Sequence, residues 1–244
     1  MDTTQSDGSG GRPAEGPSRS GSPSQSGGGS DGAPDPRVPW VVGITGASGS
    51  LYAAAVLRGL IDAGEPVDLI VSKAARLTLI DETGRSVRDA HWKDDVSAWI
   101  GRELAHADVE YWRADDFAAG PSSGSYRAKG FIAVPATAAA CAGIALGLSK
   151  DLIQRAGEVN LKERRPVVVV PRETPASRSH LQHLLELHDA GAVVVPATPA
   201  FYAGSRDLDQ VVDFLAGRIL DAAGVEHGLY RRWKGDLGAA RDDA

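Results

Sequence analysis

The chain has 244 residues, a formal net charge of −6 and one cysteine, Cys141. No stripe of Lys or Arg offsets this acidic balance, so the sequence excludes a general affinity for nucleic acid or for anionic membranes. A single cysteine cannot form an intrachain disulfide, and every apolar run is far shorter than the roughly 20 residues of a membrane span. These features predict a cytoplasmic protein in a reducing compartment.

The first 38 residues differ in composition from the rest of the chain. They are rich in Ser, Gly, Pro and Asp and have almost no aliphatic side chains, so they cannot bury enough apolar surface to offset the entropy of ordering. Their acidic residues argue against an organelle transit peptide. The sequence therefore predicts a disordered tail at 1–38, one folded domain at 39–235 and a flexible C-terminus at 236–244.

Short β-branched runs alternate with segments of helical spacing through the folded domain. Strands are expected at 38–44, 67–71, 131–134, 167–170 and 192–195. Helices are expected at 50–63, 74–81, 93–105, 138–146, 152–160, 179–190 and 208–223. Because the strands lack polar alternation, both faces of the sheet should be buried. The pattern predicts a three-layer α/β fold: a doubly wound parallel sheet of the Rossmann or flavodoxin-like kind, with helices on both faces.

A glycine-rich loop, Gly-Ile-Thr-Gly-Ala-Ser-Gly-Ser at residues 43–50, follows the first predicted strand. Glycines let the backbone approach a ligand, and the helix that follows presents free N–H groups to an anion. The alternative is a tight turn in which Ser48 or Ser50 caps the helix. The spacing departs from the dinucleotide pattern, and the second strand ends in Ser72 where a ribose-binding carboxylate would be expected. If this loop binds a phosphate, the sequence favours that of a mononucleotide over that of NAD.

Five segments follow one another in order: Gly46–Gly49, Val71–Ala75, Leu161–Pro166, Pro171–Pro175 and Pro199–Tyr202. Together, from about residue 41 to 233, they resemble the UbiX/Pad1 family of flavin prenyltransferases. The resemblance implies a homododecamer that binds FMN at subunit boundaries. It also implies that reduced FMN is joined at N5 and C6 to the prenyl group of dimethylallyl monophosphate, with no metal ion. The product, prenylated FMN, would pass to a UbiD-type decarboxylase.

The resemblance also assigns roles to individual residues. FMN would be bound by Gly46, Ala47, Ser48, Ser72, Thr137, Ala138, Ala139, Ala140 and Arg172. The prenyl phosphate would be held by Arg155, Lys162, Tyr202 and Arg218. The catalytic groups would be Glu82, Lys162, Glu173 and Trp233.

The chemistry of the implied reaction suits cations beside the prenyl phosphate. An allylic monophosphate is a poor leaving group, so without a metal ion the departing charge needs fixed cations and hydroxyl donors, such as Lys162, Arg218 and Tyr202. Alternatively, Lys162 only caps the carboxyl end of a helix. For its neighbours Arg164 and Arg165, helix capping or salt bridges between subunits is the favoured interpretation.

Ring closure at C6 requires a general base, for which Glu82 and Glu173 are the candidates. Without the resemblance, Glu82 would be interpreted as an ordinary carboxylate at a helix end. Trp233 could stabilise an allylic cation with its ring face, or pack a subunit tail. The spacing of His180, His183 and His188 does not match a zinc-binding pair, so these residues are expected at the surface or at an interface.

One loop departs from the family pattern, and two rival functions stay open. Ala140 stands where the family has a threonine, a change worth about 1 kcal/mol of FMN binding. The first rival is an FMN-dependent cysteine decarboxylase of the phosphopantothenoylcysteine type, which needs a catalytic histidine; no histidine lies between His106 and His180. The second is a non-catalytic FMN-binding subunit.

Overall fold

The computed structural model describes residues 37–201 and 207–232. Six parallel strands form one sheet in the order β3-β2-β1-β4-β5-β6. They are β1 (Trp40–Ile44), β2 (Val67–Val71), β3 (Val109–Arg113), β4 (Gly130–Ala136), β5 (Val167–Pro171) and β6 (Val193–Val194). This is the strand order of the Rossmann type, and it confirms the predicted doubly wound parallel sheet.

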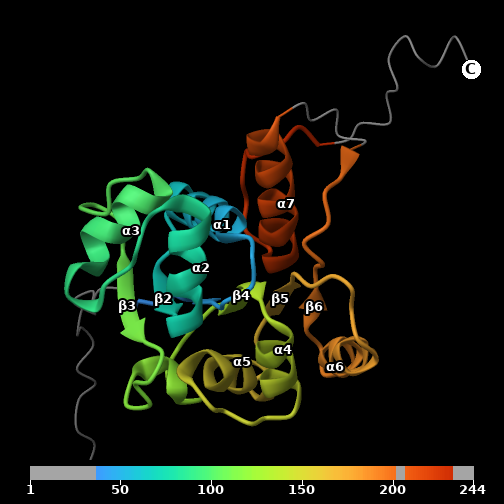
Figure 1. Cartoon of the computed structure of the whole chain (residues 1–244). Helices are drawn as coiled ribbons and strands as arrows, with labels where there is room; N and C mark the ends of the chain where they lie inside the picture. The colour runs from blue at the N-terminus through green and yellow to red at the C-terminus, as the bar shows by residue number, and fades with distance from the viewer. Residues whose placement is uncertain (1–36, 202–206, 233–244) are drawn as a thin grey trace, which may run out of the picture. The chain divides into compact units, whose positions relative to one another are not determined.

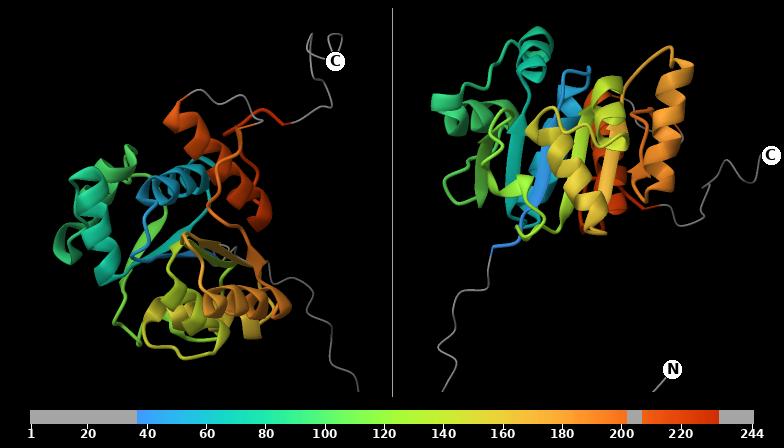
Figure 2. Two further views of the ribbon diagram at one scale, coloured as in Figure 1. Left: turned by 45° about the vertical axis from the view of Figure 1, so that its right-hand side comes forward. Right: turned by 90° about the horizontal axis from the view of Figure 1, so that it is seen from below.

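Helices cover both faces of the sheet (Figures 1 and 2). On one face lie α1 (Ser50–Asp62), α2 (Lys73–Thr83), α3 (Trp92–Ile100) and α7 (Leu208–Ala223). On the other lie α4 (Ala138–Ala145), α5 (Leu152–Lys162) and α6 (Arg178–Asp189). Two short 3₁₀ turns, η1 (Asp89–His91) and η2 (Gly120–Ser122), lie in the connections. The three predicted layers are therefore present.

Successive residues of the central strands feed two separate cores. In β1, Val42 and Ile44 pack under α1 and α7, while Val41 packs under α4 and α5. In β4, Ile132 belongs to the first core and Phe131 to the second. Both faces are apolar because both are covered, which is why these strands show no polar alternation in the sequence.

The structure corrects two expectations. The predicted helix at 93–105 ends at Ile100, because Gly101 adopts the left-handed conformation (φ 66°) that closes α3. Strand β3 was not predicted. It lies at the edge of the sheet and is only half-buried, and no helix follows it directly, so it lacks the apolar run that marks the other strands. Within the described ranges, no helix is long and apolar enough to cross a membrane.

Arg37 joins the segment before β1 to the middle of the sheet. Its guanidinium contacts the fully buried carboxylate of Asp68 at 2.7 Å, and it also donates to Asp108 at 2.7 Å and to the Val67 carbonyl at 2.9 Å. The hydroxyl of Tyr126 donates to the other oxygen of Asp68 at 2.8 Å. A buried carboxylate near the start of β2 is thus compensated by a residue that the sequence interpretation assigned to the tail.

We expect Arg37→Ala to lower the free energy of unfolding by about 3 kcal/mol, because among the described residues it leaves the buried charge of Asp68 with Tyr126 alone as partner. Urea denaturation measures this. Arg102→Ala is the matched control: Arg102 and its partner Asp62 are 48% and 50% exposed, so the loss should stay under about 1 kcal/mol. A chain that begins at residue 39 should behave like Arg37→Ala. Equal losses in Arg37→Ala and Arg102→Ala would contradict the assigned role of Arg37.

Candidate functional site

The candidate site lies at the carboxyl ends of β1 and β4, where the strand order reverses. In doubly wound sheets this reversal leaves a crevice that binds ligands. Thr45, directly after β1, spans it: its hydroxyl donates to the Pro135 carbonyl at 2.8 Å and accepts from the Thr137 N–H at 2.8 Å. Thr45 is buried. Its hydroxyl therefore holds the loops after β1 and β4 in one fixed arrangement.

Helices α1, α2 and α4 begin beside this crevice, directly after β1, β2 and β4. The hydroxyl of Ser72 caps α2 by accepting from the Ala75 N–H at 3.0 Å. The hydroxyl of Thr137 caps α4 by accepting from the Ala140 N–H at 3.1 Å. Among the described residues, no acceptor reaches the N–H groups of Ala138 and Ala139 at the start of α4. The positive ends of these helices and their free N–H groups make the edge attractive to an anion.

The start of α1 is capped by a residue from another helix. Neither Ser48 nor Ser50 caps it, so that alternative is wrong; the residue at the cap position is Gly49, which has no side chain to do so. Glu82, at the end of α2, instead accepts from the Gly49 N–H at 2.9 Å and from the Ser50 N–H at 2.8 Å. Glu82, which the sequence placed at the end of a helix, is thus hydrogen-bonded to the glycine-rich loop.

The environment of Glu82 favours its ionised form. Partial burial raises the pKa of this carboxyl, but the hydrogen bonds from Ser48 and from the N–H groups of Gly49 and Ser50 outweigh that effect and hold the pKa below its usual 4.5. A carboxylate that accepts several N–H bonds beside a helix N-terminus is stabilised as the anion. Glu82 is therefore ionised near neutral pH.

Two glycines of the loop are required by its geometry. A Cβ atom on Gly46 would lie 2.6 Å from the Cβ of Ala74, so only glycine lets this loop pack against the start of α2. Gly49 has φ +124°, a conformation that side chains rarely adopt. The hydroxyl of Thr78 in α2 donates to the Gly46 carbonyl at 3.1 Å. Loop and helix α2 therefore form one unit.

Arg172 brings the loop after β5 to the same place. Its backbone N–H donates to the Ala136 carbonyl at 3.3 Å, and its Nε donates to the Ser48 carbonyl at 3.2 Å. The next residue, Glu173, is exposed and accepts from the Thr174 N–H. One chain therefore brings together Ser48, Ser72, Glu82, Thr137 and Arg172.

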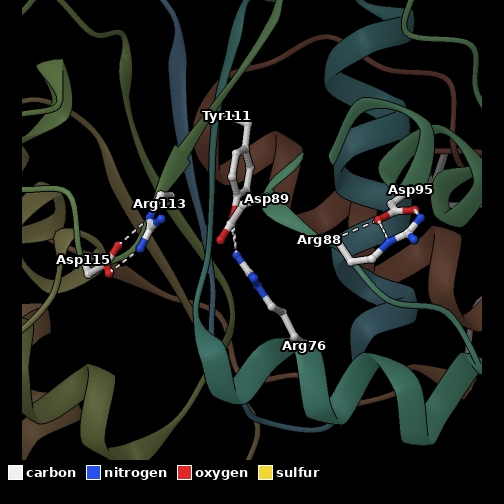
Figure 3. Close-up of polar contacts among 7 residues, drawn as sticks. All are labelled: Arg76, Arg88, Asp89, Asp95, Tyr111, Arg113 and Asp115. Atoms are coloured by element: carbon white, nitrogen blue, oxygen red, sulfur yellow. Dashed lines mark hydrogen bonds and ion pairs between the residues drawn. The ribbon is translucent and has the colours of Figure 1, made fainter. Parts of the chain in front are cut away.

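A polar network holds α2, and with it Glu82, against the edge of the sheet (Figure 3). Arg76 of α2 contacts both Asp89 and the hydroxyl of Tyr111 in β3, and Tyr111 donates to Asp89 at 2.7 Å. The Arg76 guanidinium lowers the pKa of Asp89. In the same view Arg113 and Asp115 form a separate pair.

A cavity of about 360 Å³ opens beside Ser72. Its lining contains Lys73 and two ion pairs, Arg76 with Asp89 and Arg113 with Asp115. Ser50, at the start of α1, is buried beside Glu82. Open space and free N–H groups at this edge of the sheet fit a phosphate-bearing flavin.

The remaining predicted site residues lie elsewhere. Helix α5 starts at the carboxyl edge, where the Leu152 N–H donates to the Ala114 carbonyl, and it descends to Lys162 at the amino edge. Lys162 pairs there with Glu163, and Arg155 donates to the Ser122 carbonyl and pairs with Glu158. Arg218 lies in the second half of α7. A single chain therefore does not bring these cations to Glu82, while Tyr202 and Trp233 lie outside the described residues.

Three further expectations can be compared with the structure. His180 is not a surface residue: it is 4% exposed, and neither ring nitrogen has a partner among the described residues. Arg165 donates to the Gly124 carbonyl at 2.8 Å. In the part of the chain that the structure covers, no three His, Cys, Asp or Glu residues are grouped to hold a metal ion.

Thr45, which the sequence interpretation missed, could have been noticed as a hydroxyl directly after the first strand.

Comparison with known proteins agrees with this geometry. The Flavoprotein family model matches residues 30–220, so the chain is a flavoprotein by family. Within that class, a flavin prenyltransferase UbiX from Streptomyces coelicolor is 62% identical over 213 residues, which cover 84% of this chain and 99% of the relative. Another from Methanocaldococcus jannaschii is 36% identical over 193 residues, 79% of this chain and 97% of the relative. The chain belongs to the UbiX flavin prenyltransferase family.

Solved structures agree with this assignment. One is a UbiX protein in complex with FMN and dimethylallyl pyrophosphate, with a TM-score of 0.73 and 38% identity over 82% of this chain and all of the other. A dodecameric, FMN-dependent UbiX-like decarboxylase from Escherichia coli O157:H7 has a TM-score of 0.71 and 37% identity, with the same coverage.

The capping role of Glu82 predicts a pH-dependent stability. We expect Glu82→Gln to lower the free energy of unfolding of the ligand-free protein by about 1 kcal/mol at pH 7, the usual contribution of a helix cap. Because the pKa is lower in the folded state, the carboxylate stabilises the fold above pH 4.5, and this contribution is lost as the pH falls through the folded-state pKa.

Denaturation of both proteins between pH 3 and pH 8 should therefore show a difference that shrinks towards acid. Asp81→Asn, which removes the neighbouring exposed carboxylate of α2, is the control and should show no such trend. A pH-independent difference for Glu82→Gln would contradict the proposed ionisation of Glu82.

Proposed function

We propose that this protein joins the dimethylallyl group of dimethylallyl monophosphate to N5 and C6 of reduced FMN, as a metal-independent flavin prenyltransferase. The observation that carries the proposal is the position of Glu82, an ionised carboxylate on the glycine-rich loop at the crevice of the sheet. The 62% identity to a flavin prenyltransferase supports this function over a cysteine decarboxylase or a non-catalytic FMN-binding subunit.

The residues at the carboxyl edge would hold the flavin. Reduced FMN supplies the N5 and C6 atoms that receive the prenyl group. The loop Gly46, Ala47 and Ser48, with Ser72 and Arg172, supplies hydrogen-bond donors and one guanidinium charge for a phosphate-bearing ligand. Thr137 and the N–H groups of Ala138 and Ala139 face the same edge. Ala140 is buried and lacks the hydroxyl of the threonine that the family has at this position, and its own N–H is bound by Thr137. The N–H groups of Ala138 and Ala139 would take the place of that hydroxyl.

Glu82 would act as the general base. Removal of the proton from C6 needs an acceptor that is ionised at neutral pH and held in place. Glu82 meets both requirements, because two backbone N–H groups fix its two oxygens and keep it ionised at neutral pH. The same hydrogen bonds lower its pKa and so make it a weaker base than a free glutamate. Glu173, next to Arg172, is the second carboxylate proposed near the leaving phosphate.

The phosphate-binding cations would come from a neighbouring copy of the chain. Lys162 and Arg218 lie towards the amino edge of the sheet, away from Glu82, and Arg155 is engaged by Ser122 and Glu158. A site that uses both sets would therefore lie between subunits. The dodecameric relative supports such an assembly. So do large apolar side chains left exposed on two helices: Leu77 and Ile80 on α2, and Leu181 and Leu185 on α6. Tyr202 and Trp233 are proposed to complete this site.

The product would be used by a different protein. Prenylated FMN has no role in the reaction that forms it, so we propose that a UbiD-type decarboxylase receives it.

The test is anaerobic incubation of the protein with reduced FMN and dimethylallyl monophosphate, followed by mass spectrometry of the released flavin. We expect a gain of one five-carbon group. Glu82→Gln should lose at least about 100-fold in rate, because it lacks the general base, and should still bind FMN through the loops. Asp81→Asn should match the wild type.

Unchanged flavin from wild-type protein that binds FMN, beside a control enzyme that reacts, would overturn the proposal in favour of a non-catalytic FMN-binding subunit. Conversion of a cysteinyl peptide in place of the prenyl donor would favour the decarboxylase.

A further inference from the structure

The segment that follows α7 folds back on this helix and meets it at Asp221. One oxygen of this carboxylate accepts from His227 Nε2 at 3.1 Å and from Arg232 Nη2 at 2.8 Å. The other accepts from Arg218 Nη1 at 3.2 Å and from the hydroxyl of Tyr230. Asp221 thus links a residue of α7 to three residues of the returning segment.

The hydrogen bonds define the protonation state of this cluster. His227 Nδ1 accepts from the Leu229 N–H at 3.2 Å, so the ring hydrogen lies on Nε2 and points to Asp221. Burial raises the pKa of Asp221, but hydrogen bonds from Arg232, Tyr230 and His227 outweigh it and lower the pKa to about 2. With two guanidinium groups, one carboxylate and a neutral imidazole, the cluster has one positive charge in excess.

Close packing holds the returning segment on α7. A Cβ atom on Gly217 would lie 2.5 Å from Tyr230 and 2.6 Å from His227, so this glycine lets both rings lie on the helix. The ring of Tyr230 packs against Phe214 with centroids 4.7 Å apart, and the Arg232 guanidinium lies 5.9 Å from the centroid of the Tyr230 ring. The side chain of His227 is 2% exposed. The segment up to Arg232 is therefore fixed.

We propose that Asp221 is a positioning residue that holds the guanidinium of Arg218 and the segment up to Arg232 in the arrangement that binds the prenyl phosphate. The inference rests on the proposed function, which assigns Arg218 to the phosphate and Trp233, the next residue after Arg232, to the allylic group. Asp221 does not itself touch substrate. Its carboxylate orients one cation, and the excess positive charge of the cluster suits an anionic ligand.

Binding of the phosphate can be measured separately from the reaction. Dimethylallyl monophosphate is titrated by calorimetry into FMN-loaded protein, and KM and kcat are measured beside the FMN affinity. We expect Asp221→Ala to weaken phosphate binding and raise KM by about 10- to 100-fold, the usual effect of a misplaced binding group, with FMN affinity unchanged. Asp221→Asn keeps an acceptor for Arg218 and should recover most of the loss.

Two further variants test whether the effect is specific. Asp213→Ala removes another carboxylate of α7, which pairs with Arg58 at 3.7 Å, and should bind the phosphate like the wild type. Tyr230→Phe removes one hydrogen bond to Asp221 and keeps the ring, so it should fold even if Asp221→Ala does not, with KM raised about threefold.

The alternative outcomes are distinct. Equal phosphate affinity in the wild type, Asp221→Ala and Tyr230→Phe would overturn the inference and leave the proposed function intact. Tighter binding in Asp221→Ala and Asp221→Asn would overturn it too, because the carboxylate would then only compete for Arg218. A parallel loss of FMN affinity and thermal stability in Asp221→Ala would indicate a purely structural role. Failure of the wild type to bind the phosphate would overturn the proposed function itself.

Discussion

The hydroxyl of Thr45 joins the two halves of the sheet at the point where its strand order reverses, and the geometry of the crevice depends on this contact. Through Pro135 and Thr137 it fixes the loop after β4 relative to the loop after β1. The N–H of Arg172 then ties the loop after β5 to Ala136. Hydrogen bonds therefore run across the carboxyl edge from β1 to β5, and the helix starts that follow these strands have little freedom to separate.

The helix N-termini at this edge create a positive electrostatic potential, and the carboxylate of Glu82 lies there. The start of α1 has no capping side chain of its own, and its free N–H groups would be unsatisfied without a carboxylate from α2. The same hydrogen bonds that stabilise the helix keep the carboxylate ionised. In the proposed function, one side chain would thus meet both a structural need of the fold and a chemical need of the reaction.

The cations assigned to the prenyl phosphate do not lie at the crevice. Lys162 and Arg218 lie towards the amino edge, because α5 and α7 run back down the sheet after starting at its carboxyl edge. In a parallel α/β fold, a helix runs from the carboxyl edge of the sheet to its amino edge. Residues at its two ends therefore cannot both reach a crevice at the carboxyl edge of the same chain. In the proposed function, assembly of several copies would resolve this limit, since the amino edge of one chain could face the carboxyl edge of another.

The sequence by itself determined the layers of the fold and indicated the loops that carry the candidate site. Apolar strands, helical periodicity and the glycine spacing are local properties, and they predicted five of the strands and the phosphate-binding character of residues 43–50. It also placed Glu82 at a helix end. Strand β3 was missed, because an edge strand with one exposed side lacks the local signal of a buried one.

Only the tertiary structure decided which distant groups meet. Glu82, rather than Ser48 or Ser50, caps α1, and Arg37 compensates the charge of Asp68. Both contacts join residues that are far apart in the chain. The burial of His180 likewise depends on the tertiary structure. The same holds for the separation of Lys162 and Arg218 from Glu82. Composition and periodicity describe each segment alone, whereas burial and hydrogen bonding of a charged group depend on which segments the sheet order brings together.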